Sequence, residues 1–198
     1  MTPDSSRPVA DQVQAVADTV LSGLQRRLPY GVDRHLPAAL RRSTPPGDPA
    51  LWLDLGLDRL HPDDGALDAP DYTRAATAVT ATAQLWARTD ITHRPTTADR
   101  ATTLGALAAR LSRNRPAAEL DFARALRAHT LEELLPRLRP LLQQASGLSL
   151  DFSLMARDFY TLQSPGGPHA VGQGWAHAFT EAKARARRTH STGKADPA

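Results

Sequence analysis

The chain has 198 residues, of which 41% are hydrophobic, and it contains no cysteine. This length suffices for one domain or for two small lobes with their own cores. The lack of cysteine excludes disulfides, thiol nucleophiles and cysteine-ligated metal centres. No apolar run approaches the roughly 20 residues that cross a bilayer, and the first twelve residues lack the apolar core of a secretory signal. We therefore expect a cytoplasmic protein without membrane contact.

The formal net charge of +3 is distributed unevenly. Residues 100–139 contain eight arginines against four carboxylates, and the segment from residue 181 onward contains five basic residues against two acidic ones. Only two of the 24 basic residues are lysine. Because a planar guanidinium matches phosphate oxygens in a bidentate manner, this composition favours nucleic acid as a partner. A GC-rich genome would produce the same composition, so composition alone leaves both explanations open.

In the first half of the chain, apolar residues recur at helical spacing and no segment alternates as a strand does. A helix that starts after Asp71 is expected to have this residue as its N-cap and to end near Trp86. Residues 88–99 have turn chemistry without periodicity and predict a linker. Residues 1–87 are therefore expected to form an N-terminal helical lobe, with further helices over 8–28, 36–43 and 49–60.

The second half has clearer helix signals. A helix is expected over 101–112, and Pro116 opens the next one. "TLEE" at 130–133 is a capping-box pattern, and the two prolines that follow, at 136 and 140, predict a kink or break in that helix. Asp151 is expected to cap a fourth helix, and a last helix carries Val171, Trp175 and Phe179. The sequence thus predicts an all-α protein of two small lobes, with a four- or five-helix bundle over 100–182 and a flexible basic tail over 183–198.

No catalytic motif is present: the sequence lacks metalloprotease, phosphate-loop, dinucleotide-binding and nucleophile-elbow patterns. His61, Asp63 and Asp64 form a polar turn without a second ligand cluster, which is a weak metal signal. We expect neither catalysis nor a metal or other cofactor.

The arginines give a stronger signal. Arg113 and Arg115 flank the turn between two helices, while Arg127 and Arg139 lie beside the apolar stripes of the next two. One surface of the bundle could therefore collect four guanidiniums for phosphate contact. Exposed clusters of this size often serve solubility alone, so a solvated corner remains an alternative.

Several segments in order resemble the CasB family, the small subunit of the type I-E CRISPR Cascade surveillance complex. The segments are "LGALAARLSRNRPAAELDFARALRAHTLEELLPRLRPLL", "LDFSLMARDFYTL", "VGQGWAHAF" and the earlier "AALRRS", which carries Arg41 and Arg42. The resemblance is good from about 100 to 180, partial from 8 to 45 and weak between. Asp121 stands where the family tends to have a basic residue, and the site near Leu162 stands where it tends to have tryptophan.

This resemblance implies a non-catalytic, all-helical subunit of which two copies pack along the inner face of the complex. It implies contacts with the Cascade backbone and large subunits and with the target and displaced DNA strands, with guide RNA nearby. In such systems the guide RNA reads the sequence, and R-loop formation is nearly balanced in energy. A few arginine contacts to phosphate can therefore stabilise the R-loop without reading bases. The expected phosphate-binding residues are Arg41, Arg42, Arg113, Arg115, Arg127 and Arg139.

Two other functions stay open. A helix-turn-helix regulator would use the helix opened by Pro116 for recognition, although Glu119 and Asp121 lie at the end that should face bases. A structural adaptor would place the arginines against acidic protein surfaces and would not contact DNA.

Overall fold

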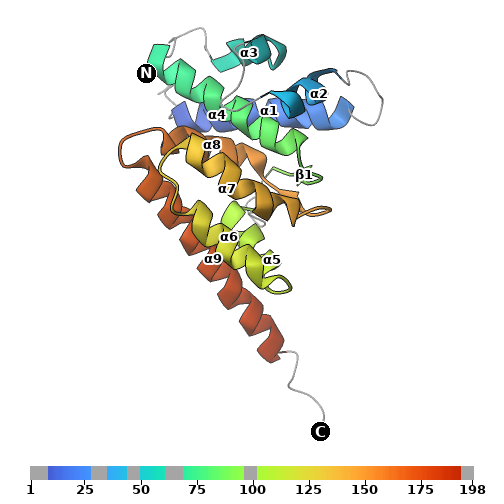
Figure 1. Ribbon diagram of the computed structural model, residues 1–198, viewed down its shortest axis with the longest axis vertical. Helices are drawn as coiled ribbons and strands as arrows, with labels where there is room; N and C mark the ends of the chain where they lie inside the picture. Colours follow the sequence, from blue (N-terminus) through green and yellow to red (C-terminus); the bar gives the residue numbers. More distant parts are fainter. Residues whose placement is uncertain (1–8, 28–34, 44–49, 61–68, 96–101, 193–198) are drawn as a thin grey trace, which may run out of the picture.

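The computed structural model describes residues 9–27, 35–43, 50–60, 69–95 and 102–192, with side chains described as far as Arg188. The described part of the chain is almost entirely helical, which confirms the all-α expectation (Figure 1). In chain order the helices are α1 (Val9–Arg27), α2 (His35–Arg42), α3 (Ala50–Asp54), the 3-10 helix η2 (Leu57–Leu60), α4 (Ala69–Ala87), α5 (Leu104–Ser112), α6 (Pro116–Ala125), α7 (Leu131–Gln143), α8 (Phe152–Leu162) and α9 (Gly167–Thr192). Within these described ranges, no helix is both long and apolar enough to cross a membrane.

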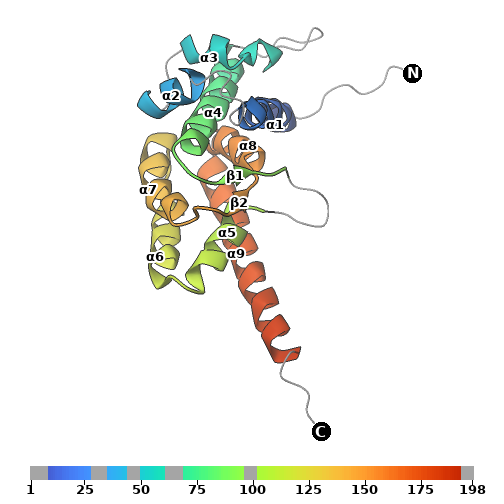
Figure 2. The same ribbon diagram turned by 90° about the vertical axis from the view of Figure 1, so that its right-hand side faces the viewer.

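Helix α8 lies between the two halves of the chain. It packs against α1 and α4 on one side and against α9 on the other, and Figures 1 and 2 show it between the α1–α4 group and the group formed by α5, α6 and α9. Phe152 and Phe159 of α8 are fully buried, and the buried apolar residues of both halves form one contiguous cluster. The two halves therefore share a core, and a division into lobes at residues 88–99 stays a prediction.

The segment that the sequence predicted to be a linker contributes one strand to a short parallel sheet. Strand β1 (Thr92–His93) pairs with β2 (Ser149–Leu150), and the amide of Thr92 donates to the carbonyl of Leu148 at 3.0 Å. Two residues per strand are too few to produce a readable alternation of polar and apolar side chains. The sequence pattern therefore missed this pair.

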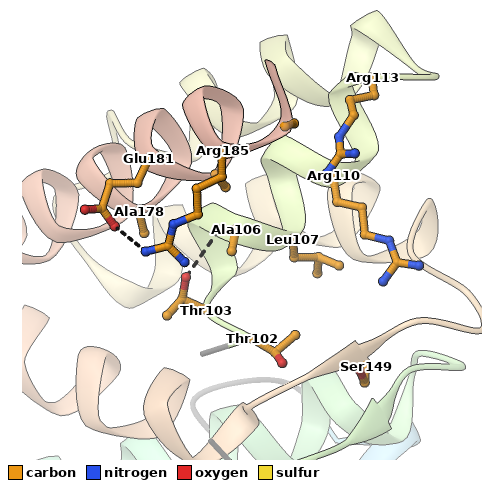
Figure 3. A pocket seen from close by; sticks show the side chains of 12 residues that line it. Thr102, Thr103, Ala106, Leu107, Arg110, Arg113, Ser149, Ala178, Glu181 and Arg185 are labelled. Carbon is orange, nitrogen blue, oxygen red and sulfur yellow. Dashed lines mark hydrogen bonds and ion pairs between the residues drawn. The ribbon is translucent and has the colours of Figure 1, made fainter. Parts of the chain in front are cut away.

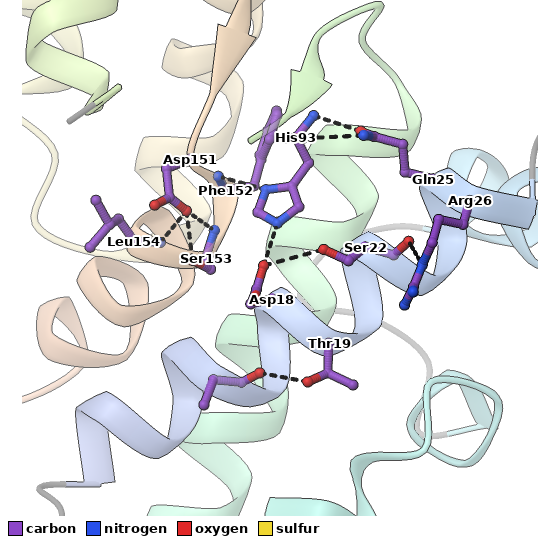
Figure 4. A network of polar contacts seen from close by, with 11 residues as sticks. Asp18, Thr19, Ser22, Gln25, Arg26, His93, Asp151, Phe152, Ser153 and Leu154 are labelled. Carbon is purple, nitrogen blue, oxygen red and sulfur yellow. Dashed lines mark hydrogen bonds and ion pairs between the residues drawn. The ribbon is translucent and has the colours of Figure 1, made fainter. Parts of the chain in front are cut away.

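His93 of β1 connects α1 to the start of α8 (Figure 4). Its side chain is fully buried; Nε2 lies 2.9 Å from Asp18 Oδ1, and Nδ1 accepts a hydrogen bond from the amide of Phe152 at 3.3 Å. Because Nδ1 is an acceptor, the ring proton belongs on Nε2, where it is donated to Asp18. The backbone of His93 also exchanges two hydrogen bonds with the side chain of Gln25.

The predicted helix starts at Thr130 and Asp151 are confirmed. Thr130 Oγ1 accepts from the amide of Glu133, whose carboxylate accepts from the amide of His129, and Asp151 accepts from the amides at 153 and 154. The prediction of Asp71 as an N-cap is wrong, because α4 begins at Ala69. Asp71 instead lies in the first turn, where the helix dipole favours a carboxylate, and it pairs with the side chain of Arg74.

Two helices differ from their predicted course. The helix expected over 49–60 ends at Asp54 and resumes as η2, because Gly56 adopts a φ of 64°. By contrast, α7 is continuous through Pro136 and Pro140, so of the expected kink or break the structure excludes the break. Both prolines are exposed, as is Glu132, whose carbonyl loses its helical partner at Pro136.

Helix α9 extends into the basic tail. It is helical to Thr192 and projects beyond the rest of the molecule (Figures 1 and 2). The segment 183–192 is therefore a helix, whereas residues 193–198 of the predicted flexible tail lie outside the described residues.

Gly105 allows α5 to lie directly against α9. A Cβ at this position would overlap the carbonyl oxygen of Trp175 and lie 2.9 Å from the amide nitrogen of Phe179. Gly105→Ala should therefore destabilise the fold by about 2–3 kcal/mol, since helix backbone cannot yield as a flexible side chain does. Chemical unfolding in urea measures this change.

Gly174→Ala is the matched control, because a Cβ at Gly174 of α9 meets nothing within 4 Å. This change should stabilise the protein by about 0.5–1 kcal/mol through helix propensity alone. Equal effects of the two substitutions would contradict the close contact at Gly105.

Asp158 on α8 accepts a hydrogen bond from the indole Nε1 of Trp175 on α9, at 2.6 Å. Burial raises the pKa of Asp158 from 3.8 to about 6, although the Trp175 hydrogen bond and the nearby Arg157 oppose this rise. Between pH 4 and pH 6, Asp158 is therefore largely protonated in the folded protein and largely ionised in the unfolded chain. The free energy of unfolding should fall by about 1–3 kcal/mol as the pH rises through this interval. Above pH 6, Asp158 should contribute little further change.

Asp158→Asn should remove this loss, because the amide oxygen still accepts from Trp175 and carries no charge. Urea unfolding of both proteins at pH 4.5 and pH 7 measures the difference. An unchanged pH dependence in the variant would show that Asp158 is not the responsible group.

Candidate nucleic-acid interface

Three arginines from the two halves of the chain meet at an open depression. The depression has a volume of about 700 Å³ and is lined by Arg41, Ala87, Arg88, Thr89, Asp90 and Arg139. Arg41 lies in the last turn of α2, Arg88 directly follows α4, and Arg139 projects from α7. We call Arg41, Arg88 and Arg139 the triad. The structure thus brings together two arginines that the sequence predicted, Arg41 and Arg139, with one that it did not.

Two triad members are held by backbone carbonyls at helix ends. Nε of Arg41 donates to the carbonyl of Ala87 at 2.6 Å, and Nε of Arg88 donates to the carbonyl of Arg41 at 3.2 Å. A second nitrogen of Arg88 donates to the carbonyl of Ser43. Carbonyls in the last turn of a helix lack partners within the helix, and basic side chains commonly satisfy them. These bonds hold the guanidiniums of Arg41 and Arg88 through neutral carbonyls, which do not neutralise their charges.

The depression concentrates positive charge. Its lining carries three arginines and one aspartate, a net formal charge of +2. Within the described residues, no triad member forms an ion pair with a carboxylate. Burial lowers the pKa of Arg88, and the positive charge of Arg139 lowers it further. An anion bound between these side chains would relieve this repulsion, and each guanidinium retains N–H donors for its oxygens.

The other four predicted arginines do not line this depression. Arg42 is exposed at the end of α2, and Arg127 is exposed just after α6. Arg115 donates from Nη1 to the carbonyl of Gln144 at 2.8 Å, so it binds the C-terminal end of α7. Arg113 lines a separate cavity between α5 and α9. The single surface expected from Arg113, Arg115, Arg127 and Arg139 is therefore divided among several places.

Arg88 was missed because it lies in the segment that the sequence predicted to be a linker. A signal for it does exist: a basic residue directly after the apolar run of α4 is the typical partner of a helix C-terminus. That signal predicts a position at the helix end. It does not predict that Arg139, 51 positions further along the chain, lies close enough to affect its pKa.

No cluster of three or more histidine, aspartate or glutamate side chains that could hold a metal ion occurs in the part of the chain that the structure describes. The turn with His61, Asp63 and Asp64 lies outside the described residues.

The fold and the triad define a small all-α protein with an arginine-lined surface. The family model for the CRISPR-associated protein Cse2 matches residues 37–179, so the chain belongs to this family. The family provides the small, structural subunit of the Cascade complex.

Two solved structures are similar to the chain. The crystal structure of CasB from Thermobifida fusca has 25% sequence identity and a TM-score of 0.64, covering 86% of this chain and 97% of that one. The crystal structure of M. ruber CasB has 22% identity and a TM-score of 0.60 over the same shares of the two chains, and it supports the fold alone. A search of curated proteins found no match.

Removing one triad charge should stabilise the free protein. Arg139→Gln removes a positive charge that faces Arg88, so the free energy of unfolding should rise by about 0.2–0.5 kcal/mol at low ionic strength. This difference should shrink in 0.5 M salt because exposed charges are then screened. Thermal unfolding at both salt concentrations measures it.

Arg157→Gln on α8 is the control, since Arg157 lies 3.8 Å from a carboxylate oxygen of Asp11. Its loss should leave stability unchanged or slightly lower. A clear loss of stability in Arg139→Gln would contradict repulsion within the triad.

Proposed function

We propose that this protein is the non-catalytic small subunit of a type I-E Cascade complex in the cytoplasm, where it takes part in antiviral defence. In this proposal two copies lie along the inner face of the complex, against its backbone and large subunits and near the guide RNA. Arginines of each copy hold phosphates of the target and displaced DNA strands and thereby stabilise the R-loop. Family membership supports the subunit role, and the triad supports the phosphate contact.

The triad is the observation that carries the DNA-binding part of the proposal. Three guanidiniums, from α2, from the residue after α4 and from α7, converge without an ion-paired carboxylate among the described residues, and two of them are hydrogen-bonded to carbonyls. Such an arrangement lowers the entropic penalty of binding, because Arg41 and Arg88 are ordered before the phosphate arrives. Contacts from guanidiniums to backbone phosphates carry no sequence information, which suits a subunit that leaves sequence recognition to RNA pairing.

Two contacts speak against a helix-turn-helix regulator. Glu119, near the start of α6, binds Nζ of Lys183 on α9 at 2.7 Å. Asp121 accepts from the side-chain amide of Gln144 at the end of α7, at 2.9 Å. The end of α6 that would have to enter the major groove is therefore acidic and tied to two neighbouring helices.

An adaptor function without DNA contact remains the second candidate, with Leu53 as the observation that favours it. This side chain is 85% exposed on α3, more than any other large apolar side chain among the described residues. A single exposed leucine is weak support for a protein interface. We therefore place DNA binding first.

Binding of labelled single-stranded and duplex DNA across a salt series tests the proposal. We expect weak binding independent of sequence, with log Kd rising linearly with log salt concentration. Arg139→Gln should lower the slope of this line by about 0.7 for single strands and about 0.9 for duplex, as expected for one lost phosphate contact.

Arg157→Gln again serves as the control, because it removes the same charge from a position that is ion-paired on α8. Equal slopes for wild type, Arg139→Gln and Arg157→Gln would contradict phosphate contact at the triad. A footprint at one defined duplex sequence would support the regulator instead.

A further inference from the structure

A second cationic cavity lies between α5, β2 and α9, away from the triad (Figure 3). It has a volume of about 470 Å³. Its polar lining consists of Thr102, Thr103, Ser149, Arg110, Arg113, Glu181 and Arg185, and the rest is formed by leucine and alanine side chains. We call it the α5–α9 cleft.

Three arginines and one carboxylate line this cleft, which gives it a net formal charge of +2. Figure 3 shows Arg110 projecting from α5 and Arg113 from the residue that follows this helix, while Arg185 reaches from α9 toward Thr103. Glu181 lies one turn before Arg185, with 3.4 Å between its Oε2 and a guanidinium nitrogen of Arg185. Both side chains of that pair are about half exposed or more, so their attraction is weak and a stronger anion can replace Glu181.

The walls of the cleft are held in place by contacts just outside it. The absence of a side chain at Gly105 brings α5 against the backbone of α9. Further along α9, the ring of Phe179 stacks on Phe122 with 5.0 Å between centroids, and the ammonium of Lys183 lies 4.9 Å from the Phe179 ring. The Lys183–Glu119 pair then fixes α9 to α6 two residues before Arg185. These contacts fix the position of α9 as far as Lys183, two residues before Arg185.

The cleft includes residues outside the part of the chain that the family model matches. The family match ends at residue 179, whereas Glu181 and Arg185 lie beyond it. The α9 extension thus completes a cationic cavity with α5 residues from within the match.

We propose that the α5–α9 cleft binds the sugar-phosphate backbone of single-stranded nucleic acid, with Arg110, Arg113 and Arg185 contacting phosphates and Glu181 competing with them for Arg185. The proposal rests on the proposed function, since it adds a second contact to a subunit that binds nucleic acid. Hydroxyl groups of Thr102 and Ser149 supply further hydrogen-bond partners, and the alanine and leucine surfaces suit the apolar faces of sugars. A single strand can bend into a cavity of this size, whereas a duplex is a wide and stiff rod.

The test uses the full chain and a labelled single-stranded oligonucleotide, with fluorescence anisotropy measured across a salt series. Arg185→Gln should weaken binding by about threefold to tenfold at low salt and reduce the salt slope by about 0.7. Glu181→Gln should tighten binding, because it removes the competing carboxylate. A loss of folding cannot imitate this opposite pair of effects, and circular dichroism checks the helicity of both variants.

Each outcome has a separate meaning. If Arg139→Gln weakens binding while Arg185→Gln and Glu181→Gln behave as wild type, the cleft proposal fails and the proposed function stands. If wild type does not bind the oligonucleotide at all, both fail. If polyglutamate displaces the oligonucleotide at equal charge concentration, the cleft is a general site for acidic chains and the proposal for nucleic acid is overturned.

Discussion

The burial of α8 is the constraint on which the rest of the structure depends. Its phenylalanines, Phe152 and Phe159, are fully buried in the cluster that both halves share. Its N-terminus is fixed by the Asp151 cap and by His93, whose ring links the amide of Phe152 to Asp18 on α1. Its other side holds α9 through the Asp158–Trp175 hydrogen bond. A helix from late in the sequence therefore joins the first helix to the last.

This central helix also sets the relative positions of the arginines. The triad needs α2 and α4 from the first half next to α7 from the second, and this arrangement follows from the packing of α4 against α8 and α7. The α5–α9 cleft needs α9 fixed along α5, and α9 in turn packs against α8. Repulsion among guanidiniums opposes both clusters, so the apolar core must supply the free energy that holds them together.

Local chemistry in the sequence predicted most of the helices. Thr130 and Asp151 start helices because a short side-chain oxygen satisfies amides that have no partner in the first turn. The spacing of valines and leucines likewise placed α1, α5 and α7 within a few residues. These features depend on neighbours in sequence, so they can be read without knowledge of the fold.

Features that depend on distant residues could not be predicted in this way. The β1–β2 pair joins residues 57 positions apart, and neither strand is long enough to show a pattern of its own. Arg41 and Arg139 were named as candidate site residues, but their meeting at Arg88 depends on how α4 lies against α7. The continuation of α9 through its arginines was obscured because a charged segment near a chain end resembles a frayed tail.

Several arginines of this protein have a structural task as well as a charge. Arg41, Arg88 and Arg115 each satisfy carbonyls at helix ends, so the arginine-rich composition has a partial explanation without any ligand. Arg139, Arg110 and Arg113 form no such bond among the contacts of the described chain. They line cavities where other arginines lie nearby. Arg41 and Arg88 therefore serve both the fold and the triad, whereas no carbonyl bond of this kind holds Arg139, Arg110 or Arg113 in the described chain.

The most direct test of the account is to observe individual arginine side chains by NMR while a single-stranded oligonucleotide is added. The Nε–Hε resonances of Arg88, Arg139 and Arg185 should shift and reach saturation as the oligonucleotide is added. Those of Arg26 on α1, which donates to the carbonyl of Ser22, and of Arg157 on α8 should stay in place. Shifts confined to Arg26 and Arg157, or small uniform shifts of all arginines, would contradict the claim that the two arginine clusters form the nucleic-acid surface.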